Sequence, residues 1–261
     1  MRKFVAILFS SLLVSCGSEP TDSTDIVFLH HSTGGAIWKG ATNRYVHKLT
    51  GKGDVERYFS KYNKANNTAY AITDMVFPKD EPYGWKNYPY DYYNIWVKNA
   101  GDQPYLEEPT LEMLTKSYDV IIFKHCYPVG IIQEDTGNPS IDSDERRLEN
   151  YKLQYQALKG KMHEFSDHKF ILWTPAALVE NNTTEAQALR TREFYEWVMN
   201  DWDEEGDNIY LWDFYQLETE GGLYLKNEYA MGPDDSHPNP TFSGKVAPLF
   251  AQFIIDIIEK Y

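Results

Sequence analysis

Four short apolar segments, spaced along the chain with helix-like segments between them, constrain the fold more than any other feature. The segments rich in β-branched or aromatic residues are 25–29, 119–123, 169–173 and 208–212. Such continuous apolar runs are typical of parallel strands buried on both faces. Apolar positions three and four apart predict helices over 144–165, 184–202 and 242–261, and Thr184 with Gln187 has the spacing of a capping box. The alternation predicts an α/β fold with a mostly parallel sheet covered on both faces.

Residues 66–110 interrupt this alternation. The segment contains Pro78, Pro82, Pro89, Pro104 and Pro109 among many aromatic residues. A loop of this length is unusual inside a compact domain, and we expect a functional lid or rim here.

The first fifteen residues have the pattern of a secretory signal. Arg2 and Lys3 precede an apolar run, which ends in small residues around Cys16. The ending Leu-Val-Ser-Cys resembles the cleavage box of bacterial lipoproteins, which implies cleavage before Cys16 and acylation of its thiol. We therefore expect a signal peptide at 1–15, a tether at 16–24 and one domain at 25–261, anchored by lipid in the bacterial cell envelope. An ordinary signal peptide with an incidental cysteine is the alternative.

Charge and cysteine content narrow the possible partners. Loss of the signal leaves 23 basic and 39 acidic residues, a net charge of −16, which argues against nucleic acid and against an electropositive membrane-docking face. Cys126 is the only cysteine besides Cys16, so we expect no intrachain disulfide.

The chemistry-bearing residues nearest the amino terminus follow the first predicted strand. His30-His31-Ser32-Thr33-Gly34-Gly35 comes directly after it. Ligands bind at the carboxyl ends of strands in open α/β sheets. A serine on a tight glycine-containing turn can expose its hydroxyl there, while its own amide and that of Gly34 or Gly35 form an oxyanion site.

A second cluster precedes the closing helix. Residues 233–240 read Pro-Asp-Asp-Ser-His-Pro-Asn-Pro and are expected to form a loop. A carboxylate three residues before His237 can reach its Nδ1 and leave Nε2 free to accept a proton from a serine. Spacing favours Asp234 for this role, with Asp235 capping the loop or binding a substrate hydroxyl.

Together these blocks resemble the SGNH hydrolase superfamily, in a divergent lipoprotein branch, over Ile26 to Phe253. The resemblance implies a three-layer α/β/α flavodoxin-like fold and metal-independent ester chemistry. It also implies Ser32 as nucleophile, Asp234 as orienting acid and His237 as base. The family's oxyanion asparagine has no match; Lys124 or His125 stands at the corresponding strand end.

We therefore predict a serine esterase acting on acylated, plausibly acetylated, glycans, without cofactor or metal. Zinc bound by His30, His31, His125, His237 and Asp235, and catalysis by Cys126, are weaker alternatives. The alternative from another class is a non-catalytic glycan-binding lipoprotein. Residues expected to contact the substrate are Trp38, Trp85, Tyr90, Trp96 and Asp235.

Overall fold

The structure is a computed structural model that describes residues 23–260. The predicted signal peptide at 1–15 and the acylated Cys16 therefore lie outside the described residues, as does the tether up to residue 22.

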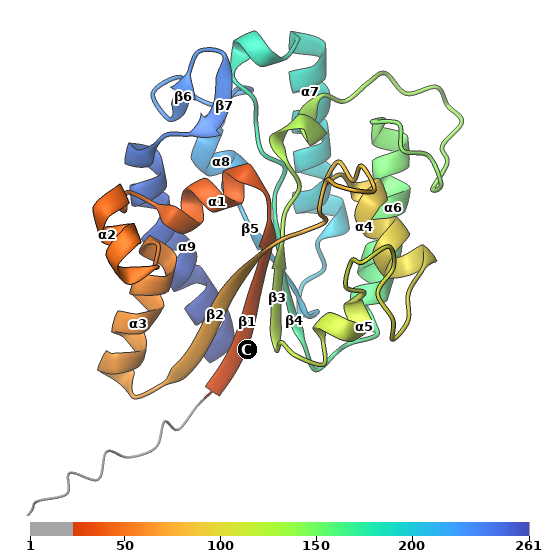
Figure 1. Ribbon diagram of the computed structural model, residues 1–261. Coiled ribbons are helices and arrows are strands. Elements are labelled where there is room, and N and C mark those ends of the chain that lie inside the picture. The colour runs from red at the N-terminus through yellow and green to blue at the C-terminus, as the bar shows by residue number, and fades with distance from the viewer. Residues whose placement is uncertain (1–22, 261) are drawn as a thin grey trace, which may run out of the picture.

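A single sheet of five parallel strands forms the centre of the molecule (Figure 1). Its spatial order is β2-β1-β3-β4-β5. This is the doubly wound, flavodoxin-like order, in which the connections leave β1 and β3 in opposite directions. The predicted α/β/α fold is thus confirmed. The strands are β1 (Ser23–His30), β2 (Ala69–Val76), β3 (Val120–Phe123), β4 (Lys169–Trp173) and β5 (Ile209–Trp212).

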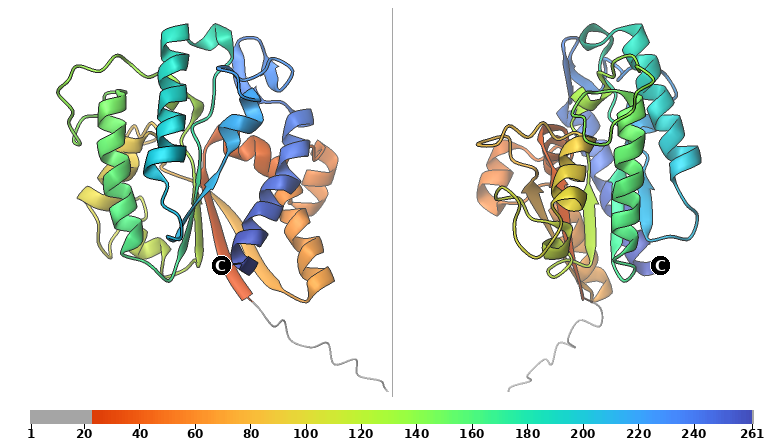
Figure 2. Two further views of the ribbon diagram at one scale, coloured as in Figure 1. Left: turned by 180° about the vertical axis from the view of Figure 1, so that it is seen from behind. Right: turned by 90° about the vertical axis from the view of Figure 1, so that its right-hand side faces the viewer.

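Helices cover both faces of the sheet (Figures 1 and 2). One face carries α1 (Ser32–Lys39), α2 (Arg44–Thr50), α3 (Asp54–Asn66) and α9 (Pro240–Lys260). The other carries α4 (Pro89–Tyr93), α5 (Leu111–Leu114), α6 (Leu148–His163) and α7 (Glu185–Trp197). The remaining elements are α8 (Phe214–Thr219), the π-helical turns η1 (Asn94–Lys98) and η4 (Val198–Trp202), the 3₁₀ turns η2 (Tyr127–Gly130) and η3 (Glu180–Asn182), and a hairpin of β6 (Ala230–Gly232) and β7 (Asp235–Pro238).

Each face of the sheet has its own apolar core. Alternate residues of β1 supply both cores: Val27 and Leu29 face α4, α6 and α7, whereas Phe28 faces α1 and α9. Both strand faces are buried because helices cover both sides, which explains the continuous apolar runs in the sequence.

The segment 66–110 is more ordered than a loop. It contains β2, which pairs with β1 from Ser23↔Ala69 to His30↔Val76. β2 is an edge strand that is partly exposed along its length, so it lacks the continuous apolar pattern of the central strands. The same segment forms α4 and η1, whose rings belong to the core.

The two long carboxyl-terminal helices follow the predicted pattern closely. Thr184 caps α7, since its hydroxyl accepts from the Gln187 amide and the Gln187 side chain accepts from the Thr184 amide. By length and hydropathy α9 could span a bilayer, but it packs against α1 and α3 with half of its apolar window buried. That burial identifies it as a core helix.

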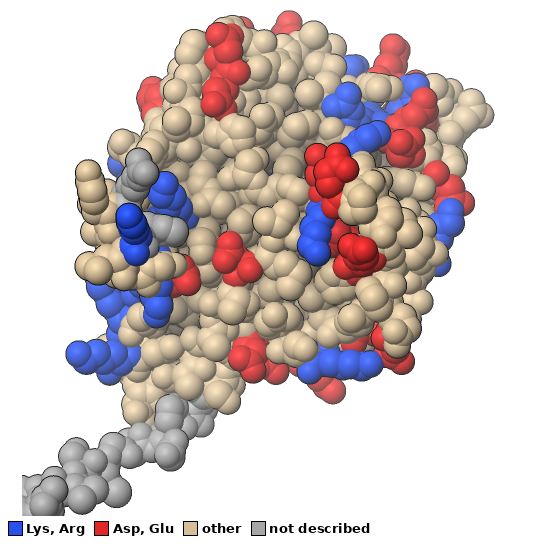
Figure 3. All heavy atoms as spheres, viewed as in Figure 1, with Lys and Arg blue, Asp and Glu red and all other residues tan. Residues whose placement is uncertain are grey.

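Charge is distributed unevenly over the surface. Residues 39–64 contain seven Lys or Arg and two Asp or Glu, against a net charge of −14 for the whole chain. Figure 3 shows basic side chains gathered at the left, over α2 and α3. Lys39, Lys48, Lys52, Lys61 and Lys64 are exposed. A negative net charge for the whole chain therefore coexists with a locally basic surface over α2 and α3.

Candidate active site

Ser32 lies at the carboxyl edge of the sheet, where the topology places ligands. It is the first residue of α1, directly after β1 and His31, and it is exposed. β1 and β3 are the neighbouring strands between which the winding direction changes, so Ser32 stands beside the crevice expected in a doubly wound sheet. The predicted position of Ser32 at a strand-to-helix turn is what the structure shows.

The first turn of α1 presents free backbone amides. Within residues 23–260, the amides of Ser32, Thr33 and Gly34 donate to no protein acceptor, as is usual for the first turn of a helix. The Gly35 amide instead donates to the His31 carbonyl at 3.0 Å. Gly35 is therefore wrong as an oxyanion donor, because its hydrogen closes the first helical turn, whereas the Thr33 amide is free.

Gly34 has a second role, in packing. A Cβ atom added there would lie 2.4 Å from the Cβ of His30 and 3.0 Å from the Phe28 ring. Only glycine lets the first turn of α1 approach the end of β1 this closely. Its amide nonetheless remains available at the start of the helix.

His237 lies on an extended strand, not on the loop expected from its proline-rich surroundings. In β7 the side chains of Asp235 and His237 share one face, because side chains alternate along a strand. The Nδ1 of His237 lies 2.6 Å from Oδ1 of Asp235, which also accepts the His237 backbone amide at 3.0 Å. These two hydrogen bonds hold the pKa of the Asp235 carboxyl below its usual range.

The assignment of Asp234 as the orienting acid is thus wrong in this geometry. Asp234 lies in the turn before β7, and its Oδ1 accepts a hydrogen bond from Asn181 at 2.9 Å. The spacing argument assumed a turn, in which residues three apart meet. The strand makes residues two apart neighbours instead.

The imidazole of His237 lies near the carboxyl edge of the sheet, where Ser32 lies. Its ring packs edge-on against Tyr127, which follows β3, with centroids 5.1 Å apart. Cα atoms of α1 and β7 come within 8 Å of one another. Among the described residues Nε2 of His237 and the Ser32 hydroxyl each have no hydrogen-bond partner, so the two groups share an edge without being joined.

Lys124 and His125 were the two candidates for an oxyanion donor at the end of β3. Neither side chain points to the carboxyl edge of the sheet near Ser32. His125 is 4% exposed and its ring contacts Tyr92, Phe123 and Tyr155 in the core. Burial lowers the pKa of His125 to about 3, which keeps the imidazole neutral. Lys124 is 1% exposed, and its Nζ donates to the His125 carbonyl at 2.6 Å. Alternation after β3 sends both side chains into the protein, and both predictions are wrong.

The alternative chemistries find little support in the positions of their residues. His30 bonds to Asp74, His31 to the Pro78 carbonyl and His237 to Asp235, so these histidines do not converge on one point within the described chain. Burial raises the pKa of Cys126, so its thiol stays protonated and is a poor nucleophile.

Most of the predicted sugar-stacking rings are core residues. Trp38 packs against Phe28, Trp85 belongs to the core cluster around α4, and Trp96 is fully buried with its Nε1 donating to the Pro109 carbonyl. Tyr90 alone of the four is only partly buried. The predicted contacts of Trp38, Trp85 and Trp96 with substrate are therefore wrong, because these rings cover the sheet.

Sequence reasoning missed the residues that hold β7 in place. Ser236, between Asp235 and His237, is buried and points away from both. Its Oγ accepts from the Val179 amide at 3.1 Å and donates to Asn182 Oδ1 at 3.0 Å. Reading residues 235–238 as a strand, with alternate side chains on opposite faces, would have predicted a buried Ser236. Pro233 and Pro240, on either side of this segment, favoured a loop instead.

Comparison with known proteins gives likeness to solved structures and no sequence match. No family model matches the chain, and no curated protein matches it. A solved structure of a carbohydrate esterase, whose active site displays divergent catalytic and non-catalytic binding functions, is similar with a TM-score of 0.39 and 11% identity. The likeness covers 89% of this chain and 65% of that one, so the chain spans about two thirds of that protein's length.

Proposed function

We propose that the protein is a serine ester hydrolase with Ser32, His237 and Asp235 as its catalytic residues. The observation that carries this proposal is the 2.6 Å contact between His237 Nδ1 and Asp235 Oδ1, at the same sheet edge as the exposed hydroxyl of Ser32. A carboxylate on Nδ1 leaves Nε2 as the acceptor, which is the arrangement that activates a serine.

In the proposed reaction Ser32 Oγ attacks the ester carbonyl carbon and its proton passes to Nε2 of His237. The carbonyl oxygen becomes negatively charged and is stabilised by the free amides of Ser32, Thr33 and Gly34 at the positive end of α1. Collapse transfers the Nε2 proton to the leaving alcohol and forms an acyl ester on Ser32. Water then attacks the acyl carbon as Nε2 of His237 takes its proton. The bond to Ser32 Oγ breaks, the proton returns from Nε2 to Oγ, and the acid leaves.

Polar groups near β7 support a proposal for the substrate class. Asp234 and Asn181 are exposed polar groups joined beside the catalytic strand, and they suit hydroxyl groups of a sugar alcohol. We therefore propose acylated glycans as substrates, with acetyl as the acyl group. The secretory pattern of residues 1–16 supports a place in the cell envelope, with the chain anchored by lipid on Cys16.

The test is release of acetate from an aryl acetate and from an acetylated oligosaccharide. Ser32→Ala and His237→Ala should each reduce turnover by at least about 10³, because the members of a triad act as a unit. Asp102→Asn, a substitution in an exposed ion pair with Lys116, is the matched control and should leave turnover unchanged. Turnover that persists in either catalytic variant would reject the assignment.

A further inference from the structure

The edge of the sheet opposite Ser32 carries a depression of about 940 Å³ that the proposed reaction does not use. It is formed by the carboxyl end of α6, the amino ends of β4 and β5, and the connection between η4 and β5. Three side chains with metal-ligating atoms meet in it: His163, Glu204 and Asp207.

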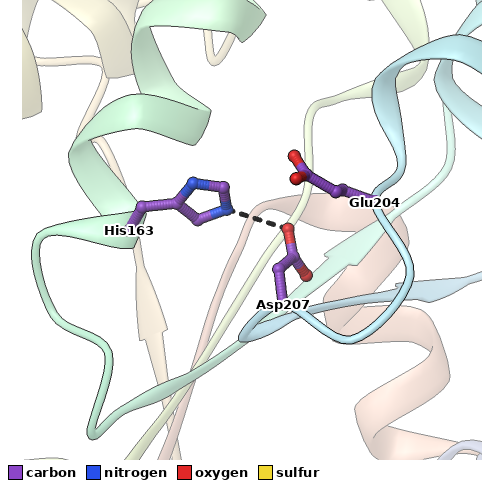
Figure 4. Close-up of side chains that lie close together, drawn as sticks. All are labelled: His163, Glu204 and Asp207. Atoms are coloured by element: carbon purple, nitrogen blue, oxygen red, sulfur yellow. Dashed lines mark hydrogen bonds and ion pairs between the residues drawn. The ribbon is translucent and has the colours of Figure 1, made fainter.

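The three ligand atoms lie close enough for one ion. His163 Nε2 is 2.8 Å from Asp207 Oδ2, and all three ligand atoms fall within 4.8 Å of one another. Figure 4 shows the imidazole and the two carboxylates approaching each other from α6 on one side and the loop before β5 on the other. Ligand atoms in a tetrahedral zinc site lie about 3.3 Å apart, since each bond is about 2.0–2.2 Å. Binding therefore requires only a small opening of the His163–Asp207 contact.

The backbone segments that carry these ligands are held together independently of the ligands. Asn208, next to Asp207, donates from Nδ2 to the carbonyls of Met162, Phe165 and His168. Met162 is next to His163, so this amide fixes the end of α6 against the start of β5. Asp207 Oδ1 accepts from the Ile209 amide at 2.8 Å, which leaves Oδ2 directed at His163. Ligands positioned by such surrounding hydrogen bonds favour metal binding.

The local charge also favours a cation. Five of the seven residues from 201 to 207 are acidic. Lys159 offsets part of this charge, because its Nζ donates to Glu204 Oε2 at 3.2 Å. Its Nζ also donates to the Trp202 carbonyl at 2.8 Å, so Lys159 keeps a partner when Glu204 turns toward an ion.

We propose that His163, Glu204 and Asp207 form a binding site for a divalent transition metal, with zinc the best match. One imidazole and two carboxylates suit zinc better than magnesium or calcium, which prefer oxygen ligands alone. Side-chain exposures of 35% for His163 and 60% for Glu204 leave the remaining coordination positions to water. The ion would join α6 to β5 and act on stability, since it lies at the edge opposite Ser32.

The experiment uses the chain from Gly17 to Tyr261, which contains the whole described α/β unit and omits the thiol of Cys16. After treatment with a chelator and dialysis, zinc binding is measured by isothermal titration calorimetry and by the change in melting temperature. Visible absorption of Co²⁺ in the same site reports imidazole and carboxylate ligation. We expect one zinc per chain and a melting temperature that rises with zinc concentration.

Glu204→Gln and Glu205→Gln form the matched pair, because both remove one negative charge from the same loop and only Glu204 supplies a ligand. Affinity should fall by at least about tenfold in Glu204→Gln and in His163→Ala, and little in Glu205→Gln. Equal losses of zinc affinity in the two glutamine variants would show that zinc is attracted only to an acidic surface, and this would overturn the proposed site. So would the absence of binding, or a zinc affinity or Co²⁺ spectrum unaltered in His163→Ala. Ester turnover is expected to be unaffected by zinc removal, so the outcome is separate from the proposed reaction.

Discussion

At the scale of single residues, the two adjacent aspartates before His237 have different partners. Asp235 receives two hydrogen bonds from His237, and Asp234 receives one from Asn181. In the proposed triad the orienting role therefore falls to Asp235, because side chains alternate in β7. It does not follow the Asp-x-x-His spacing that resembles the SGNH motif.

This difference leads to a prediction on paired variants. Asp235→Asn should reduce ester turnover by at least about 10³, because an amide at this position no longer stabilises the imidazolium that forms during the reaction. Asp234→Asn should reduce turnover only a few-fold, through weaker substrate binding. Steady-state kinetics of both variants measure the two losses in turnover. A larger loss in Asp234→Asn than in Asp235→Asn would assign the orienting role to Asp234.

His125 gives a prediction about stability at low pH. Burial lowers its folded-state pKa to about 3, whereas the ordinary value is 6.5. The unfolded chain therefore binds a proton at this residue below pH 6.5 that the folded chain does not bind. The free energy of unfolding should fall as the pH falls from about 6.5 toward 3, by up to about 1.4 kcal/mol per pH unit from this residue.

His125→Phe removes that titrating group and keeps a ring among Tyr92, Phe123 and Tyr155. Urea unfolding of this variant should show a smaller loss of stability between pH 7 and pH 4 than the unaltered protein shows. Packing strain in the variant changes stability equally at every pH, so the change in unfolding free energy with pH isolates the contribution of His125 protonation. The same pH dependence in both proteins would mean that His125 is protonated in the folded state.

At the scale of elements, β7 is the least expected piece of the site. The segment 233–240, which contains β7, has three prolines and no apolar alternation, so sequence patterns indicate a loop. Only the tertiary partners reveal the strand: Ser236 is anchored to Val179 and Asn182, and β6 pairs with it in an antiparallel hairpin. The central strands and α6, α7 and α9 were predictable, because burial gives them long periodic patterns.

Ser236 therefore provides a prediction about positioning. Ser236→Ala leaves the Val179 amide without its acceptor, which should cost about 1–3 kcal/mol of stability. It should also lower kcat more than it raises KM, because β7 holds the imidazole. Ser140→Ala, at an exposed serine, is the control. A variant that loses stability but keeps full kcat would limit Ser236 to a structural role.

At the scale of the whole molecule, the sequence was sufficient for four of the five strands and for the edge that holds Ser32, whereas β2 lies in a segment that was expected to be a loop. It was not sufficient to tell which polar residues face that edge. Lys124 and His125 follow β3 as expected, yet both point into the protein. The tryptophans of 66–110 resemble a binding surface in composition and form a core instead. Such outcomes depend on tertiary packing, which a local pattern does not report.

The central claim is that an activated serine stands at residue 32, and covalent labelling tests it most directly. A fluorophosphonate probe followed by peptide mass spectrometry should place one adduct on Ser32. Labelling should be lost in Ser32→Ala and His237→Ala and retained in Asp234→Asn. An unlabelled protein, an adduct on another residue, or labelling of Ser32 that survives in His237→Ala would contradict the account.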